Sequence, residues 1–329
     1  MKAVVCSEYG PPEVLQLAQV EKPVPKDNEV LIEVHAASLN KADWILISGK
    51  PFIVRLMGEG FLRPKSKIPG ADIAGRVEAV GKKVMQLRLG DEVFGNLSGS
   101  GRGGFAEFAC GSEDAFVLKP ANISYEQAAT VPVAAITALQ SLRDKGKIQS
   151  GQKVLINGAS GGVGTFAVQI AKSFGAEVTA VCSTRNLDIA RSIGADHVID
   201  YTQEDFTKNG QHYDLILGAN GYQPISHYKR ALSPNGIYVM AGGSGAQIFQ
   251  AMFLGRLISK TGSKKMLTES CSLTREDLAF MSGLLGAGKV VPAIDRRYPL
   301  SQVPEALRYL GEGHAKGKVV ITVKGDDEA

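Results

Sequence analysis

Residues 153–172 read KVLIN (Lys153–Asn157), GASGGVG (Gly158–Gly164) and TFAVQIAK (Thr165–Lys172). The first segment is an apolar run typical of a buried strand, the second is a glycine-rich turn, and the third begins a helical pattern. A strand that passes through such a turn into a helix is the unit that binds the pyrophosphate of a dinucleotide. Gly161 lets the backbone approach the phosphates and Gly164 lets helix and strand pack closely. Free N–H groups and the positive end of the helix dipole then face the ligand.

The pattern around this stretch predicts a parallel, doubly wound α/β sheet over residues 124–267. Ser124 and Gln127 form a capping box at the start of a helix predicted for Tyr125–Lys145. Apolar strands and helices then alternate, as repeated βα units require. The predicted strands are Lys153–Asn157, Glu177–Val181, His197–Asp200, Leu215–Leu217 and Gly236–Ala241, and the predicted helices are Val163–Phe174, Asn186–Ile193 and Tyr222–Leu232.

The two ends of the chain predict a second, β-rich domain made of residues 1–123 and 268–329. A chain of 329 residues is long for one core and fits two domains. Short runs bounded by Gly, Pro and Asp predict strands at Lys2–Cys6, Val30–Ala36, Ile73–Val80 and Glu92–Asn96. After about Thr268 the chain is expected to rejoin this domain, with helices at Arg275–Gly286 and Val303–Leu310 and strands at Ala293–Pro299 and Lys318–Val323.

Composition excludes several classes of function. The net charge is only +4 and basic residues are scattered, so no nucleic-acid partner is expected. No apolar run approaches the roughly 20 residues of a membrane span. Four cysteines lie far apart without a CxxC pair, and the N-terminus lacks a signal-peptide core. We therefore expect a reducing compartment and a cytoplasmic location.

The end of the second strand of the dinucleotide unit indicates which cofactor binds. NAD-binding units place Asp or Glu about 20 residues after the turn to hold the ribose 2′-hydroxyl. Here Ser183, Thr184 and Arg185 stand at this place, and an arginine suits a 2′-phosphate. Tyr201, after the next strand, is predicted to flank the adenine. The alternative for Arg185 is a solvated residue at a helix start. NADPH is the predicted cofactor.

Motifs along the whole chain resemble the medium-chain dehydrogenase/reductase superfamily, in its zinc-independent quinone oxidoreductase and enone reductase branch. They are Leu39–Trp44 (LNKADW), Pro69–Gly75 (PGADIAG), Gly104–Glu107 (GFAE), Gly194–Tyr201 (GADHVIDY) and Gly317–Val320 (GKVV), together with the phosphate turn. The resemblance implies a GroES-like, barrel-type substrate domain built from both chain ends, a Rossmann domain between them, and a homodimer.

The resemblance also implies the absence of a catalytic metal. Zinc members of the superfamily carry Cys, His and Cys at positions that match Asn40, Ala71 and Val133 here. Alanine and valine cannot ligate zinc, and one amide oxygen cannot hold it. The loop of four structural cysteines is missing near Gly95–Gly104. We expect no zinc.

Without a Lewis acid, the accessible chemistry is hydride addition to an electron-poor carbon, as in conjugated enones and quinones. The resemblance places Asn40 and Asp43 at the nicotinamide end of the cleft, with Asn40 as a polar anchor and Asp43 either catalytic or fixing the loop. Thr137 matches a position that contacts the nicotinamide, or else it bonds its own helix backbone. The predicted cofactor-binding residues are Thr137, Ser160, Gly161, Gly162, Val163, Gly164, Ser183, Thr184, Arg185, Tyr201, Ala241, Gly242, Gly243 and Lys318.

Two apolar-basic segments, 51–63 and 248–265, carry no motif. They suit the walls of a lipophilic substrate pocket, a dimer face or, less well, a membrane-surface contact. The predicted function is NADPH-dependent reduction of a small lipophilic quinone or α,β-unsaturated carbonyl. A catalytically quiet NADPH-binding protein or a membrane-associated protein on the same scaffold is the alternative.

Overall fold

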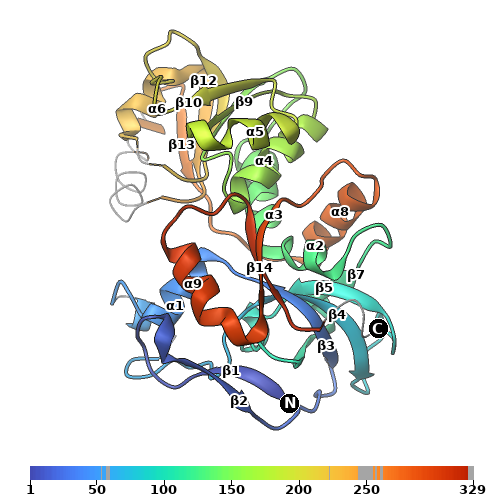
Figure 1. The fold of residues 1–329 in the computed structure, drawn as a ribbon. Helices are drawn as coiled ribbons and strands as arrows, with labels where there is room; N and C mark the ends of the chain where they lie inside the picture. Colours follow the sequence, from blue (N-terminus) through green and yellow to red (C-terminus); the bar gives the residue numbers. More distant parts are fainter. Residues whose placement is uncertain are drawn as a thin grey trace. The chain divides into compact units, whose positions relative to one another are not determined.

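A computed structural model describes residues 1–52, 54–56, 60–221, 223–243, 255, 258–259 and 262–324 (Figure 1). The chain forms two compact units. Unit 1 comprises Met1–Val133, Leu273–Gly286 and Ile294–Ala329, and unit 2 comprises Ala134–Ser272 and Ala287–Ala293.

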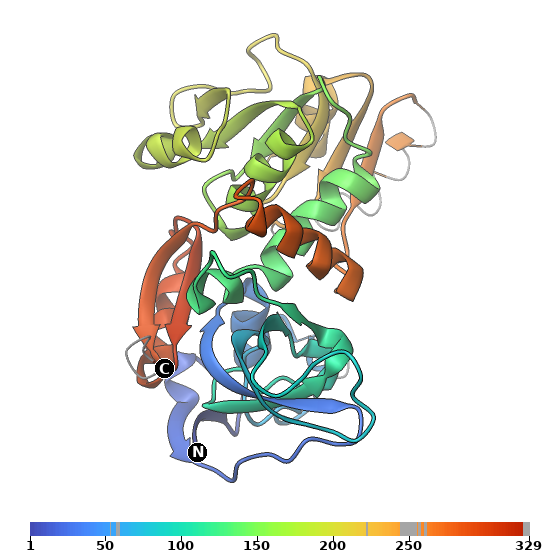
Figure 2. The same cartoon turned by 90° about the vertical axis from the view of Figure 1, so that its right-hand side faces the viewer.

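Unit 1 is built around strand β3 (Glu29–Ser38), which is buried along most of its length. It pairs antiparallel with β4 (Asp72–Val80), β6 (Phe108–Ser112) and β15 (Lys318–Thr322). The strand β15 comes from the C-terminal part of the chain, which Figure 2 shows in red beside the blue N-terminal strands. The remaining strands of this unit are β1 (Lys2–Cys6), β2 (Leu15–Gln19), β5 (Glu92–Asn96), β7 (Phe116–Leu118) and β14 (Ile294–Pro299).

The strands of unit 1 enclose one apolar core, in which Ile32, Ile73, Phe105 and Phe116 are fully buried. Helix α1 (Lys41–Ser48) packs against α9 (Val303–Gly311), α2 (Tyr125–Ala129) packs on β3 and β4, and α8 (Arg275–Gly286) packs on β7.

Unit 2 is a six-stranded parallel sheet in the order β10-β9-β8-β11-β12-β13. From β8 (Lys153–Asn157) the chain first adds β9 (Glu177–Cys182) and β10 (His197–Asp200) on one side. It then adds β11 (Tyr213–Gly218), β12 (Leu232–Met240) and β13 (Lys265–Thr268) on the other. The order of the strands reverses between β8 and β11. In doubly wound sheets, ligands bind at such a reversal, beside the carboxyl ends of the strands.

Helices α4 (Gly162–Ser173), α5 (Leu187–Ser192) and α6 (Ile225–Ala231) lie between successive strands of this sheet. Helix α4 packs on β8 and β9. The predicted doubly wound α/β fold is confirmed, and strands β1, β5, β8 and β10 have the bounds expected from the sequence.

The single helix predicted for Tyr125–Lys145 is wrong. Its capping box is present, because Ser124 Oγ accepts from the N–H of Gln127 and Gln127 Oε1 accepts from the N–H of Ser124. The helix nevertheless breaks into α2, α3 (Pro132–Leu139) and a turn of π-helix over Gln140–Lys145. Pro132 explains the break: it lacks an N–H and disfavours helical backbone at the residue before it.

The division between the units also differs from the predicted boundaries at 123 and 267. Because α2 packs on β3 and β4, residues 124–133 belong to unit 1. Residues 287–293 join unit 2, where the Gln169 side chain bonds both the N–H and the C=O of Val291, at 2.8 and 2.9 Å. Long-range hydrogen bonds of this kind leave no local sequence signal.

Candidate functional site

The glycine-rich turn between β8 and α4 lies at the carboxyl end of the parallel sheet. Gly158 adopts a φ of +84°, and a Cβ there would lie 2.7 Å from the backbone nitrogen of Asn220. Gly161 is the N-cap of α4, and its carbonyl accepts the N–H of Thr165 at 2.9 Å. The turn thereby directs the first N–H groups of a twelve-residue helix away from the strand.

Gly161 and Gly164 serve different purposes. A Cβ on Gly164 would lie 2.1 Å from the carbonyl oxygen of Gly158, so the close packing of turn and helix requires glycine there. A Cβ on Gly161 would meet nothing nearer than that same oxygen at 3.6 Å. No protein atom therefore fills the space beside Gly161. This is the arrangement expected where a pyrophosphate approaches the backbone.

Two hydroxyls predicted to bind the cofactor, those of Ser160 and Ser183, lie around one buried amide. Asn186 Nδ2 is 2.9 Å from Ser160 Oγ and 3.3 Å from Ser183 Oγ. The Oδ1 atom of Asn186 is buried without a hydrogen-bond partner among the described residues. Sequence reasoning missed Asn186, which ties the phosphate turn to the loop after β9.

The loop after β9 carries Thr184 and Arg185, both exposed. Thr184 Oγ1 donates to Asp200 Oδ2 at 2.5 Å, and the side chain and N–H of Thr202 donate to Asp200 Oδ1 at 2.8 and 2.9 Å. These hydrogen bonds, led by that from Thr184, lower the pKa of Asp200. The neighbouring strand β10 thus brings the Asp200 carboxylate beside the loop after β9, although β9 and that loop contain no acidic residue at this place.

The other predicted cofactor residues of unit 2 lie on separate elements. The N–H groups of Ala241 and Gly242 both donate to the carbonyl of Gly218, at 3.0 and 3.1 Å, which holds the carboxyl ends of β11 and β12 together. Gly243 has a φ of +149°, and Tyr201 is 59% exposed. Thr137 is buried in α3, and its hydroxyl makes no hydrogen bond to a described residue, the helix backbone included.

Unit 1 gathers Asn40, Lys318 and a residue that was not predicted, Asp72. Strand register explains the meeting, because Ser38 of β3 pairs with both Asp72 of β4 and Val320 of β15. Residues adjacent to these pairs in three strands therefore lie beside one another. Asp72 belongs to the motif Pro69–Gly75, but the sequence predicts no role for it, since its partners are distant in the chain.

The three side chains form a buried network. Lys318 Nζ donates to Asn40 Oδ1 at 2.6 Å and to the carbonyl of Leu39 at 2.9 Å. Asn40 Nδ2 donates to Asp72 Oδ2 at 2.8 Å. Asp72 also accepts from Asn96 Nδ2 at 2.6 Å and from the N–H of Val133 at 3.2 Å.

The charges of this network are almost fully removed from water, with Asp72 0% and Lys318 3% exposed. Their atoms Oδ2 and Nζ are 3.9 Å apart. Burial raises the pKa of Asp72, opposed mainly by the Lys318 charge, and burial lowers the pKa of Lys318, opposed mainly by Asp72. Each charge compensates the other. A direct contact of Lys318 with a cofactor stays a prediction.

Asp43 is the second acid of the region and caps helix α1. Its Oδ2 accepts the N–H of Asn40 at 2.8 Å. Burial raises the pKa of Asp43 to about 6; the hydrogen bond from Asn40 opposes the shift and the charge of Asp72 adds to it. The hydrogen bond agrees with the expected loop-fixing role, and a catalytic role stays a prediction.

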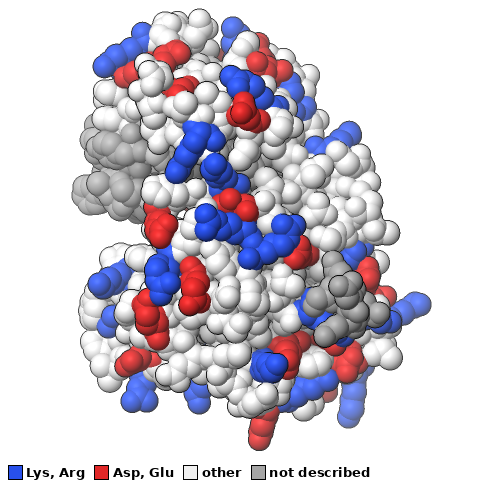
Figure 3. Space-filling view, viewed as in Figure 1, with Lys and Arg blue, Asp and Glu red and all other residues white. Residues whose placement is uncertain are grey.

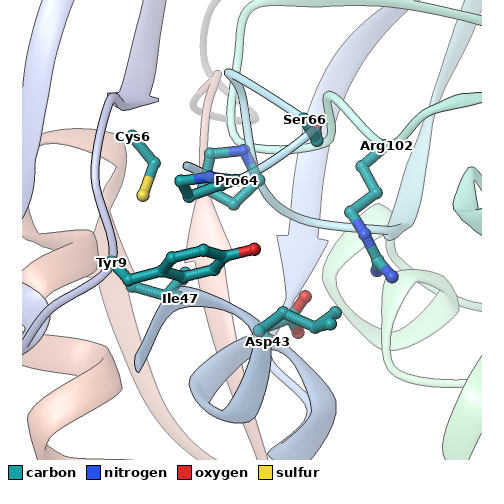
Figure 4. Close-up of a pocket in the computed structure, with 9 residues that line it drawn as sticks. Cys6, Tyr9, Asp43, Ile47, Pro64, Ser66 and Arg102 are labelled. Carbon is teal, nitrogen blue, oxygen red and sulfur yellow. The ribbon is translucent and has the colours of Figure 1, made fainter. Parts of the chain in front are cut away.

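A small pocket opens beside Asp43 (Figure 4). Asp43 and Arg102 face each other across it, and Cys6, Tyr9 and Ile47 line its wall. Arg102 has a φ of +69° and lies between two glycines that also have positive φ. Non-glycine residues rarely adopt this conformation, and Arg102, like Asn186 and Asp72, was not predicted from the sequence.

The positions that match zinc ligands carry no metal ligand of the expected kind. Asn40 is held by Lys318 and Asp72, Ala71 is buried, and Val133 contributes only its backbone N–H to Asp72. Among the described residues there is no group of three His, Cys, Asp or Glu side chains able to hold a metal ion. The absence of zinc stays a prediction.

Parts of the two apolar-basic segments lie outside the described residues, including 57–59 and 244–254. In the part of 51–63 that is described, Phe52 and Leu56 are more than half exposed. None of the described helices is long and apolar enough to span a bilayer. On the face seen in Figure 3, basic and acidic side chains are interspersed.

Two family models match the chain: an alcohol dehydrogenase GroES-like domain over residues 26–121 and a zinc-binding dehydrogenase domain over residues 193–321. A chloroplast envelope quinone oxidoreductase homolog of Arabidopsis thaliana is 36% identical, over 98% of both chains. A 2-methylene-furan-3-one reductase of Solanum lycopersicum is 35% identical over 98% of this chain and 79% of its own. The solved quinone oxidoreductase of Coxiella burnetii has a TM-score of 0.85 and 31% identity, over 98% of this chain and 99% of its own.

Proposed function

The chain belongs to the medium-chain dehydrogenase/reductase superfamily, in its quinone oxidoreductase and enone reductase branch, and we propose that it reduces quinones or α,β-unsaturated carbonyls with NADPH and without zinc. The name of a further relative, an NADPH-dependent alkenal/one oxidoreductase of Arabidopsis thaliana that is 33% identical, supports this substrate class.

One observation carries the proposal: a buried amide, Asn40, is held between an ammonium and a carboxylate at a position where zinc members have a metal ligand. An amide donates hydrogen bonds but cannot act as a Lewis acid. A site of this kind favours substrates that are already electron-poor at the carbon to be reduced, because hydride addition there needs only a donor to the developing oxyanion.

The residues of unit 2 fit a dinucleotide, since room is left at Gly161 and the hydroxyls of Ser160 and Ser183 lie around the buried Asn186. When bound, NADPH supplies the hydride. The chain holds the pyrophosphate with the N–H groups that begin α4. Asn40 donates to the carbonyl oxygen of the substrate, and the enolate that forms takes its proton from water or another group.

We propose NADPH over NADH on the basis of Arg185, whose guanidinium is exposed at the end of β9 without an ion pair to a described residue. Asp200 lies on the next strand, yet three donors from Thr184 and Thr202 already satisfy its oxygens. Asp200 therefore acts mainly as a tie between two loops. The guanidinium remains available for the 2′-phosphate.

Arg185→Ala is expected to weaken NADPH binding by roughly 10-fold to 100-fold, because a charge-assisted contact of about 1.5–3 kcal/mol is lost. NADH binding is expected to stay within about twofold, since NADH lacks the 2′-phosphate. Titration of cofactor fluorescence measures both. Arg191→Ala is the matched control, because Arg191 is an exposed arginine of α5 paired with Asp188. Equal losses for NADPH and NADH would refute the role of Arg185.

A panel of quinones and of short and long conjugated enones tests the reaction class. We expect loss of the absorbance of reduced cofactor with NADPH, much slower loss with NADH, and no effect of chelators. Tight NADPH binding without turnover of any panel member would overturn the proposal and leave a catalytically quiet binding protein. Stimulation by added zinc would contradict the metal-free chemistry.

A cytoplasmic homodimer with a small lipophilic substrate and no nucleic-acid partner completes the proposal. The interspersed charges of the face in Figure 3 support the absence of a nucleic-acid partner. Light scattering of the purified protein tests the dimer. Flotation with lipid vesicles tests the alternative that the exposed Phe52 and Leu56 belong to a membrane contact.

A further inference from the structure

We propose that Lys318 and Asp72 are positioning residues that fix the Asn40 amide with an N–H group directed at the substrate carbonyl oxygen. The inference deepens the proposed function and rests on it. It assigns a role to Asp72, for which none was predicted, and a role in orienting Asn40 to Lys318 beside its predicted cofactor contact.

The chemistry of the two partners fixes the orientation of the amide. The Lys318 ammonium only donates, and it lies 2.6 Å from Asn40 Oδ1. The Asp72 carboxylate accepts from Asn40 Nδ2 at 2.8 Å. A rotation of the amide by half a turn would place N–H against N–H and oxygen against oxygen. Asn40 therefore has one orientation.

The partners themselves are held from further elements. Lys318 also donates to the Leu39 carbonyl, and Asp72 also accepts from Asn96 and from the Val133 backbone. One Asn40 N–H is used by Asp72. The second N–H of the amide has no acceptor among the described residues. It is the group that we assign to the substrate oxygen.

The ammonium on Asn40 Oδ1 also makes the amide a better donor. A hydrogen bond from a cation to the carbonyl end polarises the amide and strengthens the donor at its nitrogen end. The charge of Lys318 thereby strengthens the hydrogen bond from Asn40 to the substrate, although the lysine itself does not contact the substrate. Stability alone does not explain why this buried ion pair is present, since apolar side chains of similar volume often give proteins that are equally stable.

A double-mutant cycle between Asn40 and Lys318 tests the assignment. Removing one oxyanion donor typically lowers kcat by about 10²–10³-fold. We expect Asn40→Ala to lower kcat by about 100-fold, Lys318→Met by about 10-fold or more, and the double variant by no more than Asn40→Ala alone. The number of NADPH-binding sites per chain, measured by fluorescence titration, normalises each kcat to folded enzyme. Losses that multiply in the double variant would show that Lys318 acts independently of Asn40 and would overturn the proposal.

Loss of one buried charge also destabilises the fold, so a second pair of variants separates stability from positioning. Lys318→Met combined with Asp72→Asn removes both charges and is expected to recover most of the melting temperature lost by Lys318→Met. The low kcat should persist, because the amide of Asn40 is no longer oriented. Recovery of kcat together with melting temperature would leave the network a structural role only.

Lys119→Met is the matched control in the same unit. The Lys119 side chain is 5% exposed and paired with Glu92 at 3.0 Å, without contact to Asn40. We expect a lower melting temperature and an unchanged kcat. A kcat loss as large as that of Lys318→Met would show that any buried lysine of this unit matters, which would contradict the specific role.

The ionisation of 4-nitrophenol provides a readout without turnover, because its phenolate resembles the enolate oxyanion and absorbs visibly. The wild-type protein is expected to bind the phenolate more tightly than the phenol, and Asn40→Ala and Lys318→Met should each lose this preference. Preference retained in Lys318→Met would refute the inference. If the wild-type protein reduces no enone or quinone, the proposed function fails instead, and the two failures are distinguishable.

Discussion

Gly161→Val is expected to lose NADPH affinity by more than about 100-fold while keeping the melting temperature of the wild-type protein. The backbone at Gly161 is extended, with φ −83° and ψ 174°, which valine readily adopts. The nearest atom to an added Cβ is 3.6 Å away, so the fold accommodates it. The side chain instead fills the space through which the pyrophosphate approaches. Fluorescence titration with NADPH, alongside a thermal melt, measures both quantities.

Two neighbouring substitutions make this result specific. Gly161→Ala, with a smaller side chain, should lose less affinity than Gly161→Val. Gly164→Ala places its Cβ 2.1 Å from the carbonyl oxygen of Gly158 and should lower the melting temperature as well as the affinity. Full NADPH affinity in Gly161→Val would mean that the turn does not hold the phosphates.

The second large effect concerns the dependence of stability on pH. Burial raises the pKa of Asp43 in the folded protein to about 6, from an ordinary value of 3.8. Asp72 and Lys318 of the buried network and Arg102 across the pocket are the charged groups that act on it. The folded state therefore favours the protonated form of Asp43. The stability that this preference contributes is fully present below pH 3.8, the ordinary pKa, and is lost as the pH rises through about 6.

Asp43→Asn does not titrate and supplies the comparison. Between about pH 4 and pH 7, the wild-type protein should lose about 2 kcal/mol of unfolding free energy relative to this variant. The only tryptophan of the chain, Trp44, lies next to Asp43 in α1, so its fluorescence during denaturant unfolding reports on unit 1. Stability curves of the two proteins that run parallel with pH would contradict the buried, protonated state of Asp43.

The sequence predicts the nucleotide-binding unit well because its constraints are local. The glycines at 158, 161 and 164, the apolar strand before them and the helix after them are contiguous, and each has a physical requirement that can be stated from the chain. The same holds for the capping box of Ser124 and Gln127. The extension of that helix across Pro132 fails because the apolar pattern continues where the backbone cannot.

The substrate-side site depends on residues that are remote in the chain. Asp72 and Lys318 meet only because β4 and β15 both pair with β3, a register that no local pattern reveals. The role of Asp200 is not predicted for a similar reason, since its side chain contacts Thr184 from a neighbouring parallel strand. In a predicted parallel sheet, polar residues at the carboxyl ends of two neighbouring strands can therefore be expected to contact each other.

The fate of a deuterium label tests the central claim most directly. NADPH that carries deuterium at C4 on the transferred face, incubated with the protein and a conjugated enone, should give a saturated ketone with deuterium at its β-carbon, located by NMR. The same label in an allylic alcohol, at the former carbonyl carbon, would show carbonyl reduction of the alcohol dehydrogenase type. That result, or unlabelled product, would contradict the reduction of the conjugated double bond by hydride from NADPH.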